Sequence, residues 1–307
     1  PETTPLIEEI IPEPKLKEFR EVGSADFGFA YSEKARFRVA VFRQKHYDAM
    51  VCRLIPNDLL TFEQLGLTED VVQLIERPRG LLLVTGPTGS GKTTTLATMI
   101  DHINQTQPIH IVTIEDPIEY YHDHKKAIVN QREVGTDVPS FAEAIRRALR
   151  EDPDVILLGE MRDLETIATA ITAAETGHLV FGTLHTTGSA RTVDRIIDQF
   201  PPEQQEQVRV QLSVSLIGVI SQVLMPRADN EGLVAGFEVM TMTAGIENHI
   251  RKNETFKIPS AIQTGKGKGM FLLDDHLLEL FEAGKIDQGQ VLAKCQDPRR
   301  TREKLGL

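Results

Sequence analysis

The chain has 307 residues, 40% of them hydrophobic and 26% charged, which is enough apolar material for one large domain and a smaller one. Its net charge of −11 disfavours non-specific nucleic-acid binding, and the isolated Cys52 and Cys295 indicate neither a disulfide framework nor a zinc site. The sequence has no apolar run of about 18 residues and no secretory signal, so we expect a cytoplasmic protein without membrane insertion.

The N-terminal part of the chain predicts a small domain. Residues 1–22 have a loosely helical spacing of apolar side chains, interrupted by Pro12 and Pro14. From residue 26 to 54 apolar and polar side chains alternate, which predicts a small sheet. Pro56-Asn57-Asp58 is typical of a linker, so we place the domains at 1–57 and 58–307.

Four arginines lie on the strands of this predicted sheet. Arginines on exposed strands usually face solvent, but one or two of these could reach a phosphate at a domain or subunit boundary. The four are Arg36, Arg38, Arg43 and Arg53.

After the linker, residues 61–75 predict one helix that ends before Pro78. Short apolar runs then alternate with helical patterns, which is typical of a parallel sheet covered on both faces. A long helix is expected over 203–224, followed by an edge strand over 233–240 and further helices. The predicted parallel strands are 81–84, 109–114, 155–158 and 179–184.

The strand at 81–84 leads into a glycine-rich turn that fits the pattern G-x-x-x-x-G-K-[ST]. Its glycines let successive backbone N–H groups converge on phosphate oxygens at the start of a helix. Lys92 would then reach the β- and γ-phosphates, and the Thr93 hydroxyl could bind Mg²⁺. We therefore predict a nucleoside triphosphate site. Its residues are Gly86, Pro87, Thr88, Gly89, Ser90, Gly91, Lys92, Thr93 and Thr94.

Acidic residues follow two other predicted strands. Glu115, Asp116 and Glu119 come after 109–114, and Glu160 and Asp163 come after 155–158. Ligands bind at the carboxyl ends of the strands in such sheets. These carboxylates could hold Mg²⁺, directly or through water, or orient a water molecule for attack on the γ-phosphate. One such acid could simply cap a helix, but acids at two strand ends favour an active site.

Two histidines flank the last predicted parallel strand. His185 follows it and could sense the γ-phosphate, although a lone histidine is more often structural. His178 precedes it and would lie farther away unless a loop folds back. The segments 122–124 and 274–276 also contain histidine and aspartate, but they lack partners at metal-ligand spacing, so we interpret them as solvated polar segments.

Together these motifs resemble the PilT-like type IV pilus retraction ATPases of the secretion ATPase superfamily. The resemblance extends from about Asp26 to Ile286. Residues 86–93 match the Walker A box of the family, 114–119 its Asp box and 155–163 its atypical Walker B segment. Residues 175–187 resemble the His box, which favours a role for His178 as well as His185.

The resemblance implies an α/β fold with a RecA-like ATPase domain and a smaller, PAS-like N-terminal domain. It implies a homohexameric ring that uses ATP and Mg²⁺ to retract pili while docked on an inner-membrane platform protein. In such a ring the N-terminal domain packs against the RecA-like domain of a neighbouring subunit, and arginines matching Arg36, Arg38 and Arg53 face the nucleotide. The resemblance also implies that Glu160 positions Mg²⁺ or its water and that the Asp box activates the attacking water, for which we favour Glu119 over Glu115.

Other functions stay open on the sequence alone. Pilus assembly and type II secretion ATPases are similar, but commonly carry a tetracysteine insertion that two isolated cysteines cannot build. Residues 260–265 resemble the retraction branch, whereas 244–250 match its C-terminal motif only weakly. The N-terminal domain lacks the first strands of the family, so we expect the sequence to begin inside that domain. A nucleotide-gated scaffold with little hydrolysis is an alternative of another class, and the charge disfavours a nucleic-acid translocase.

Overall fold

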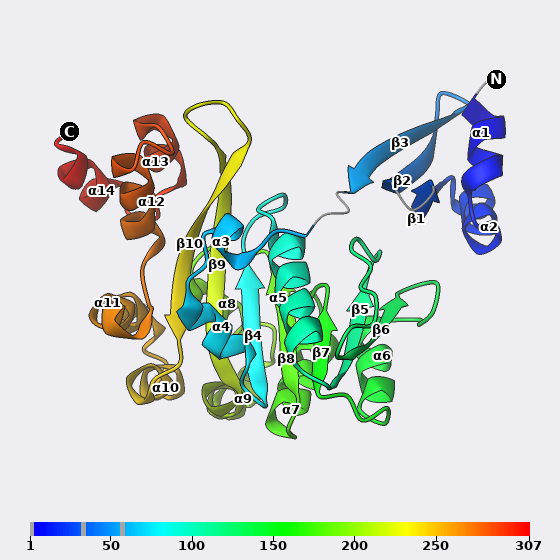
Figure 1. The fold of residues 1–307 in the computed structure, drawn as a ribbon. Helices are drawn as coiled ribbons and strands as arrows, with labels where there is room; N and C mark the ends of the chain where they lie inside the picture. Colours follow the sequence, from blue (N-terminus) through cyan, green and yellow to red (C-terminus); the bar gives the residue numbers. More distant parts are fainter. Residues whose placement is uncertain (1–2, 32–34, 56–58) are drawn as a thin grey trace.

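Two separate sheets organise the chain (Figure 1). The computed structural model describes residues 3–31, 35–55 and 59–307. A small antiparallel sheet lies in the N-terminal part and a large, mostly parallel sheet in the rest. The predicted α/β fold is confirmed, whereas the predicted linker at 56–58 lies outside the described residues.

The N-terminal sheet packs against two helices. Pro12 precedes the second helix and Pro14 lies in its first turn, where a missing backbone N–H breaks no helical hydrogen bond. Buried side chains such as Phe19, Phe27 and Val39 join the helices to the sheet. The elements are α1 (Thr3–Ile10), α2 (Glu13–Val22), β1 (Ser24–Tyr31), β2 (Ala35–Gln44) and β3 (Tyr47–Ile55).

The large sheet contains all four predicted parallel strands. In the described chain its strands are β4 (Gly80–Thr85), β5 (His110–Glu115), β6 (Ile128–Glu133), β7 (Val155–Leu158), β8 (Leu179–Leu184), β9 (Leu216–Pro226) and β10 (Leu233–Thr241). Their order is β10-β9-β4-β8-β7-β5-β6. Neighbouring strands run parallel except for the edge strand β10, which is antiparallel to β9. The other edge strand, β6, was not predicted because most of its residues are polar.

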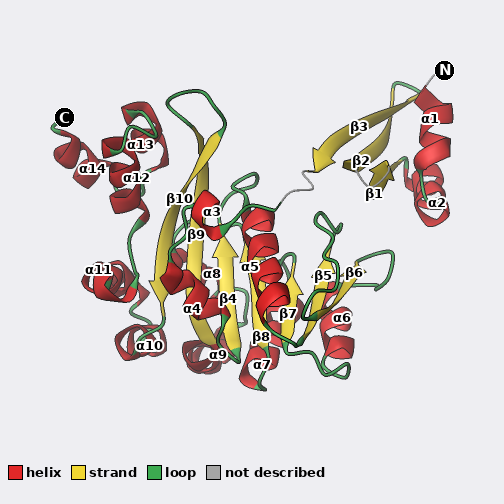
Figure 2. Cartoon of the chain, viewed as in Figure 1, coloured by secondary structure: helices red, strands yellow, loops and turns green. Residues whose placement is uncertain are grey.

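Helices cover both faces of this sheet (Figure 2). On one face α4 (Glu69–Ile75) and α5 (Lys92–Thr106) pack over Leu82 and Val84. On the other face the alternate residues Leu81 and Leu83 pack against a larger group of helices. These are α6 (Phe141–Ala148), α7 (Leu164–Glu175), α8 (Ser189–Ile197), α9 (Pro202–Ser215), α10 (Ala244–Arg251) and α11 (Ile258–Thr264).

The last helices form a separate unit beside β9 and β10. Val223 and Met225 of β9 pack against Leu273 and Leu277 in a small core of their own. The helices of this unit are α12 (Leu273–Glu282), α13 (Gln288–Lys294) and α14 (Pro298–Leu305).

The predicted helix over 203–224 is wrong in its second half. Helix α9 ends at Ser215, and the chain continues directly as β9 between β4 and β10. The residues from 216 to 223 are all buried, because a central strand is covered on both faces. Such a strand shows no alternation of apolar and polar side chains, so its pattern resembles that of a buried helix.

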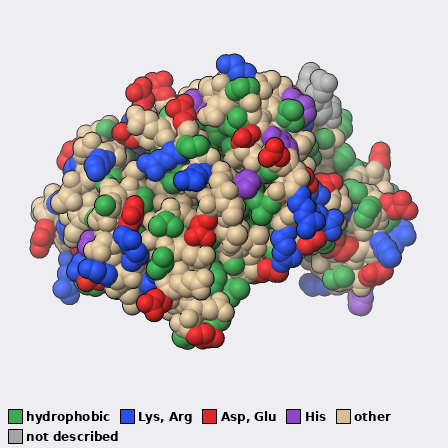
Figure 3. All heavy atoms as spheres, turned by 90° about the horizontal axis from the view of Figure 1, so that it is seen from below, with side chains coloured by type: hydrophobic (Ala, Val, Ile, Leu, Met, Phe, Trp, Pro, Cys, Tyr) green, Lys and Arg blue, Asp and Glu red, His purple; other side chains and the backbone are tan. Residues whose placement is uncertain are grey.

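The predicted helix over 61–75 is also two elements. Helix α3 (Phe62–Leu65) ends at Gly66, whose positive φ of 79° forms a left-handed cap, and α4 begins after it. Of the helices that the structure describes, none combines the length and the apolar character needed to cross a bilayer. Acidic and basic side chains are intermingled on the face shown in Figure 3.

Candidate active site

The glycine-rich turn connects β4 to α5 at the carboxyl edge of the large sheet. Gly86, Gly89 and Gly91 have φ values of 148°, 76° and 88°, which L side chains rarely adopt. A Cβ at Gly86 would lie 2.2 Å from the carbonyl oxygen of Gln222. Helix α5 begins directly after this turn, and no side chain caps it. Its first backbone N–H groups are therefore available to a phosphate.

Lys92 folds back over this phosphate loop. Its ammonium donates hydrogen bonds to the carbonyl oxygens of Gly86, at 2.9 Å, and Pro87, at 3.1 Å. Burial lowers the pKa of Lys92, while the carboxylates of Glu160 and Glu119 oppose that shift. The lysine is thus held where the loop would receive a phosphate.

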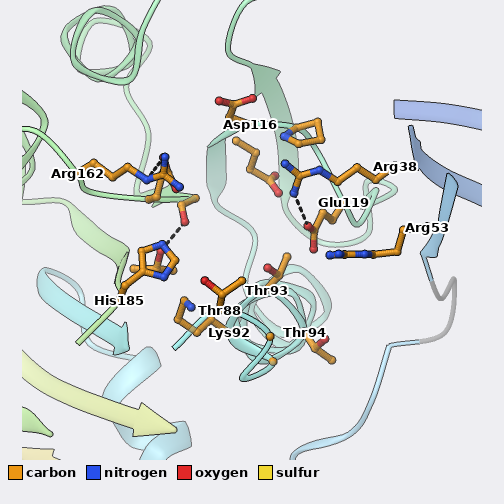
Figure 4. Close-up of a pocket in the computed structure, with 17 residues that line it drawn as sticks. Arg38, Arg53, Thr88, Lys92, Thr93, Thr94, Asp116, Glu119, Arg162 and His185 are labelled. Atoms are coloured by element: carbon orange, nitrogen blue, oxygen red, sulfur yellow. Dashed lines mark hydrogen bonds and ion pairs between the residues drawn. The ribbon is translucent and has the colours of Figure 1, made fainter. Parts of the chain in front are cut away.

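A cavity of about 500 Å³ opens above the loop (Figure 4). The ends of β4, β5, β7 and β8 contribute to it, and so does the N-terminal sheet. Six of the nine residues predicted as nucleotide ligands line it, namely Thr88, Gly89, Gly91, Lys92, Thr93 and Thr94. Its other functional side chains are Arg38, Arg53, Glu115, Asp116, Glu119, Glu160, Arg162 and His185.

Glu115 is the most buried acid of the cavity, with 8% of its surface exposed. Its carboxyl group accepts hydrogen bonds from the Thr113 hydroxyl, at 2.6 Å, and from the Gln131 side-chain amide, at 3.3 Å. Burial nevertheless raises the pKa of Glu115 to about 7. Near neutral pH this carboxyl group can therefore either take up or release a proton.

Glu119 and Glu160, the other two acids expected to take part in catalysis, each face an arginine. Glu119 lies 3.5 Å from a guanidinium nitrogen of Arg38, and Glu160 lies 2.7 Å from Nε of Arg162. Burial raises the pKa of Glu160, and the charge of Arg162 counteracts this shift. Both carboxylates therefore bring negative charge to a cavity that also contains several cations.

The N-terminal arginines divide into two groups. Arg38 and Arg53 line the cavity. Arg36, by contrast, lies over the ring of Tyr121, with its guanidinium carbon 3.8 Å from the ring centroid. Arg43 lies 3.5 Å from Asp48 within its own domain. Neither Arg36 nor Arg43 is among the described residues that line the cavity.

The two histidines lie at opposite ends of β8. His185 lines the cavity, and burial together with the charges of Lys92 and Arg162 lowers its pKa. His178 lies before the strand, where its Nδ1 is 3.0 Å from the carbonyl oxygen of Ala173. Within this chain the structure thus brings only His185 to the phosphate loop, as their positions in the sequence indicated.

The segment 274–276 is not a solvated polar segment, and this prediction is wrong. Asp274 and Asp275 are buried. Asp275 accepts hydrogen bonds from Arg300, at 2.9 Å, and Lys304, at 2.7 Å, so it joins α12 to α14. His276 accepts a hydrogen bond from a backbone N–H of β10. Within the described ranges no group of three or more His, Cys, Asp or Glu side chains is arranged to hold a metal ion.

Sequence reasoning missed Gln222, a buried residue of β9 that contacts the phosphate loop. Its side-chain amide donates a hydrogen bond to the carbonyl oxygen of Ser90 at 2.5 Å. The signal was available, because Gln222 is a polar residue towards the carboxyl end of an apolar strand. It went unused because the segment was predicted to be helical.

Residues 25–261 match the family described as Type II/IV secretion system protein. The chain belongs to this family. It is 52% identical to the type IV pilus retractation ATPase PilT of Pseudomonas aeruginosa over 95% of this chain and 85% of that protein. It is also 50% identical to a twitching motility protein of Neisseria gonorrhoeae, over 92% of this chain and 75% of the relative.

The structural comparison agrees with this assignment. A crystal structure of the pilus retraction motor PilT with bound ADP matches with a TM-score of 0.90 and 48% identity, over 97% of this chain and 85% of that chain. The type II secretion system protein E of Xanthomonas campestris pv. campestris matches only 62% of this chain, at 40% identity. The predicted retraction-ATPase family and the prediction of an ATP hydrolase are confirmed.

Proposed function

We propose that the chain works as a homohexameric, Mg²⁺-dependent ATPase motor that powers type IV pilus retraction. One observation carries the proposal: the phosphate loop, acids from two strand ends and arginines from a second domain meet in one cavity. The similarity to PilT supports retraction as the output. In this proposal the motor is cytoplasmic, docks on the inner-membrane platform protein of the pilus machine and binds no nucleic acid.

The phosphate loop binds the triphosphate in this proposal. Its convergent N–H groups and the start of α5 bind phosphate oxygens, and Lys92 exchanges its two loop carbonyls for the β- and γ-phosphates. Thr93 and Glu160 supply oxygen atoms of the kind that Mg²⁺ prefers, and both line the cavity. A bound Mg²⁺ would neutralise charge that develops on the phosphates.

Acids and arginines act on the γ-phosphate. Glu119 orients and deprotonates the attacking water, with Glu115 as the alternative base. Arg38 now faces Glu119, and with Arg53 it can turn towards the phosphates from the N-terminal domain. His185 senses the γ-phosphate. His178 is remote from this cavity, so it would report the state of the γ-phosphate to a neighbouring subunit. Arg36 would act indirectly, by fixing the position of the N-terminal domain.

Phosphate release by the purified oligomer tests the chemistry. We expect Lys92→Ala and Glu160→Gln each to lower ATP turnover at least about 100-fold while circular dichroism shows an intact fold. Lys125→Ala is the matched control, because Lys125 is an exposed lysine paired with Asp101 outside the cavity. Turnover unchanged in either active-site variant would overturn the assignment, and negligible turnover in the wild type would favour a nucleotide-gated scaffold.

A motility assay tests the mechanical output. The chain is expressed in a Pseudomonas aeruginosa strain that lacks PilT, and both twitching and surface pili are scored. We expect the wild-type chain to restore twitching and Lys92→Ala to leave the cells hyperpiliated and non-motile. An active ATPase that restores no twitching in this strain would argue for the assembly or secretion alternative.

A further inference from the structure

Gln222 lies behind the phosphate loop, on the strand next to β4. Ser221 is aligned with Thr85, the last residue of β4, so Gln222 is level with the beginning of the loop. Only 2% of its surface is exposed. Gln222 is not among the described residues that line the nucleotide cavity. It therefore supports the loop from the side away from the ligand.

The side chain of Gln222 joins two parts of the loop region. Its Nε2 donates to the carbonyl oxygen of Ser90 at 2.5 Å, and its Oε1 accepts from the Thr95 hydroxyl at 2.9 Å. Ser90 lies in the turn and Thr95 in the first turn of α5. An amide provides a donor and an acceptor at once, which neither a carboxylate nor an apolar side chain of this length can do.

Gln222 also leaves little room for side chains on the loop. A Cβ on Gly86 would lie 2.2 Å from the carbonyl oxygen of Gln222, and a Cβ on Gly91 would lie 3.1 Å from its Nε2. Gln222 therefore lies against the beginning of the turn at Gly86 and against its end at Ser90 and Gly91. Glycines make this turn mobile in the absence of such contacts, because they restrict the backbone least.

We propose that Gln222 is a positioning residue for nucleotide binding, which holds the phosphate loop in the conformation where its N–H groups converge. A loop fixed in its binding conformation before the ligand arrives loses less entropy on binding. The inference rests on the nucleotide site proposed above. It adds to that site a residue from β9 that does not touch the phosphates.

The test compares Gln222→Met with wild type. Methionine keeps the length of the side chain and removes both hydrogen bonds. We expect the Kd for a fluorescent ADP analogue and the KM for ATP to rise about tenfold or more. We expect kcat at saturating ATP to change less than about threefold, because the loop binds the ground and transition states alike.

The control is Gln205→Met on α9. Gln205 is half-buried, and its Nε2, like that of Gln222, donates to a backbone carbonyl oxygen, that of Phe200 at 3.1 Å. We expect this variant to bind ADP with wild-type affinity. Thermal unfolding without nucleotide shows whether each variant folds. Thr95→Val, which removes only the bond to Oε1, is the second probe and should raise the KM in the same direction.

Three outcomes would contradict the inference alone. Wild-type ADP affinity in folded Gln222→Met overturns it, and so does a loss of kcat with an unchanged KM. If Gln222→Met does not fold, an unchanged KM in Thr95→Val overturns it. A wild-type protein that binds no ADP would overturn the proposed function, and the inference with it, which separates the two failures.

Discussion

Two acids of the same segment, Glu115 and Glu119, have opposite environments. Glu115 ends β5 inside the molecule, where burial raises its pKa to about 7. Glu119 lies four residues further, is only partly buried and faces Arg38. Groups of one chemical type can divide acid and base roles when their surroundings differ in this way. Under the proposed function, the partly exposed Glu119 would activate water and the buried Glu115 would exchange a proton.

The first prediction separates these two acids by turnover. We expect Glu119→Gln to reduce kcat at least about 100-fold, because the amide cannot accept the proton of the attacking water. Glu115→Gln should reduce it by less than about tenfold, because the amide can still accept the Thr113 hydrogen bond. Steady-state phosphate release at saturating ATP measures both values of kcat. The reverse order of effects would assign the base to Glu115.

The second prediction concerns the pH dependence of stability. The pKa of Glu115 is raised in the folded state, so ionisation favours unfolding: the free energy of unfolding falls as the pH rises from about 4.5 to about 7. The shift corresponds to roughly 3 kcal/mol at most. In Glu115→Gln we expect the free energy of unfolding to stay constant over this pH range. In Glu63→Gln, at an exposed site, it should fall as in the wild type. Urea unfolding of the nucleotide-free protein at pH 5 and pH 8 measures the difference, and equal pH dependence in both variants would refute it.

At the level of elements, the ends of β7 and β8 are packed together through a glycine. Gly182 of β8 leaves room for Met161, whose Sδ would lie 2.2 Å from a Cβ at this position. Met161 is buried, and its backbone N–H donates to the carbonyl oxygen of Thr183 at 3.0 Å. Because Met161 follows Glu160 directly, this packing also determines where that carboxylate lies.

The third prediction tests this packing. Gly182→Ala should lower stability by about 1–3 kcal/mol, because the added methyl group forces Met161 out of place. It should also lower ATP turnover by displacing Glu160. In a double-mutant cycle, Met161→Ala should cost less in the Gly182→Ala background than in the wild type. Additive effects in denaturant unfolding would show that the two residues do not interact.

The sequence predicted elements whose pattern is local and missed those that depend on neighbours. The phosphate loop and the acids after β5 and β7 were recognised because each motif lies within a few residues. The strand β9 lies between β4 and β10, and its residues 216–223 are all buried. Because such a strand shows no alternation of apolar and polar side chains, it was predicted as helix. Gln222 was missed for the same reason. The contacts of Arg36 and Arg38 depend on how two domains pack, which no local pattern reveals.

At the level of the whole molecule, one strand of the small sheet contacts one loop of the large domain. Arg36 and Arg38, both on β2, contact Tyr121 and Glu119 of the loop after β5. Successive even positions of a strand point to the same side, so both arginines face this loop. One of these contacts reaches the cavity, and the other holds the ring of a tyrosine outside it.

The fourth prediction follows from this pair of contacts. Arg36→Ala and Tyr121→Ala should each weaken the contact between the domains by about 1 kcal/mol, the usual scale of a cation–π interaction. Hydrogen exchange should then rise in residues 119–121 and in β2. Tyr47→Ala, at an exposed position on β3, should leave this exchange unchanged. Unaltered exchange in both contact variants would show that the ring contact does not hold the domains together.

The pairing of β9 with β10 has a mechanical consequence. Gln222, beside the phosphate loop, is aligned with Phe237, whose N–H donates to the ring of His276 on α12 at 2.9 Å. Only one pair of strands therefore separates the nucleotide from the last helices of the chain. Along this path the antiparallel backbone ladder joins β9 to β10. A force applied to α12 would therefore be transmitted to the phosphate loop through few contacts. A displacement of the loop would be transmitted to α12 by the same contacts.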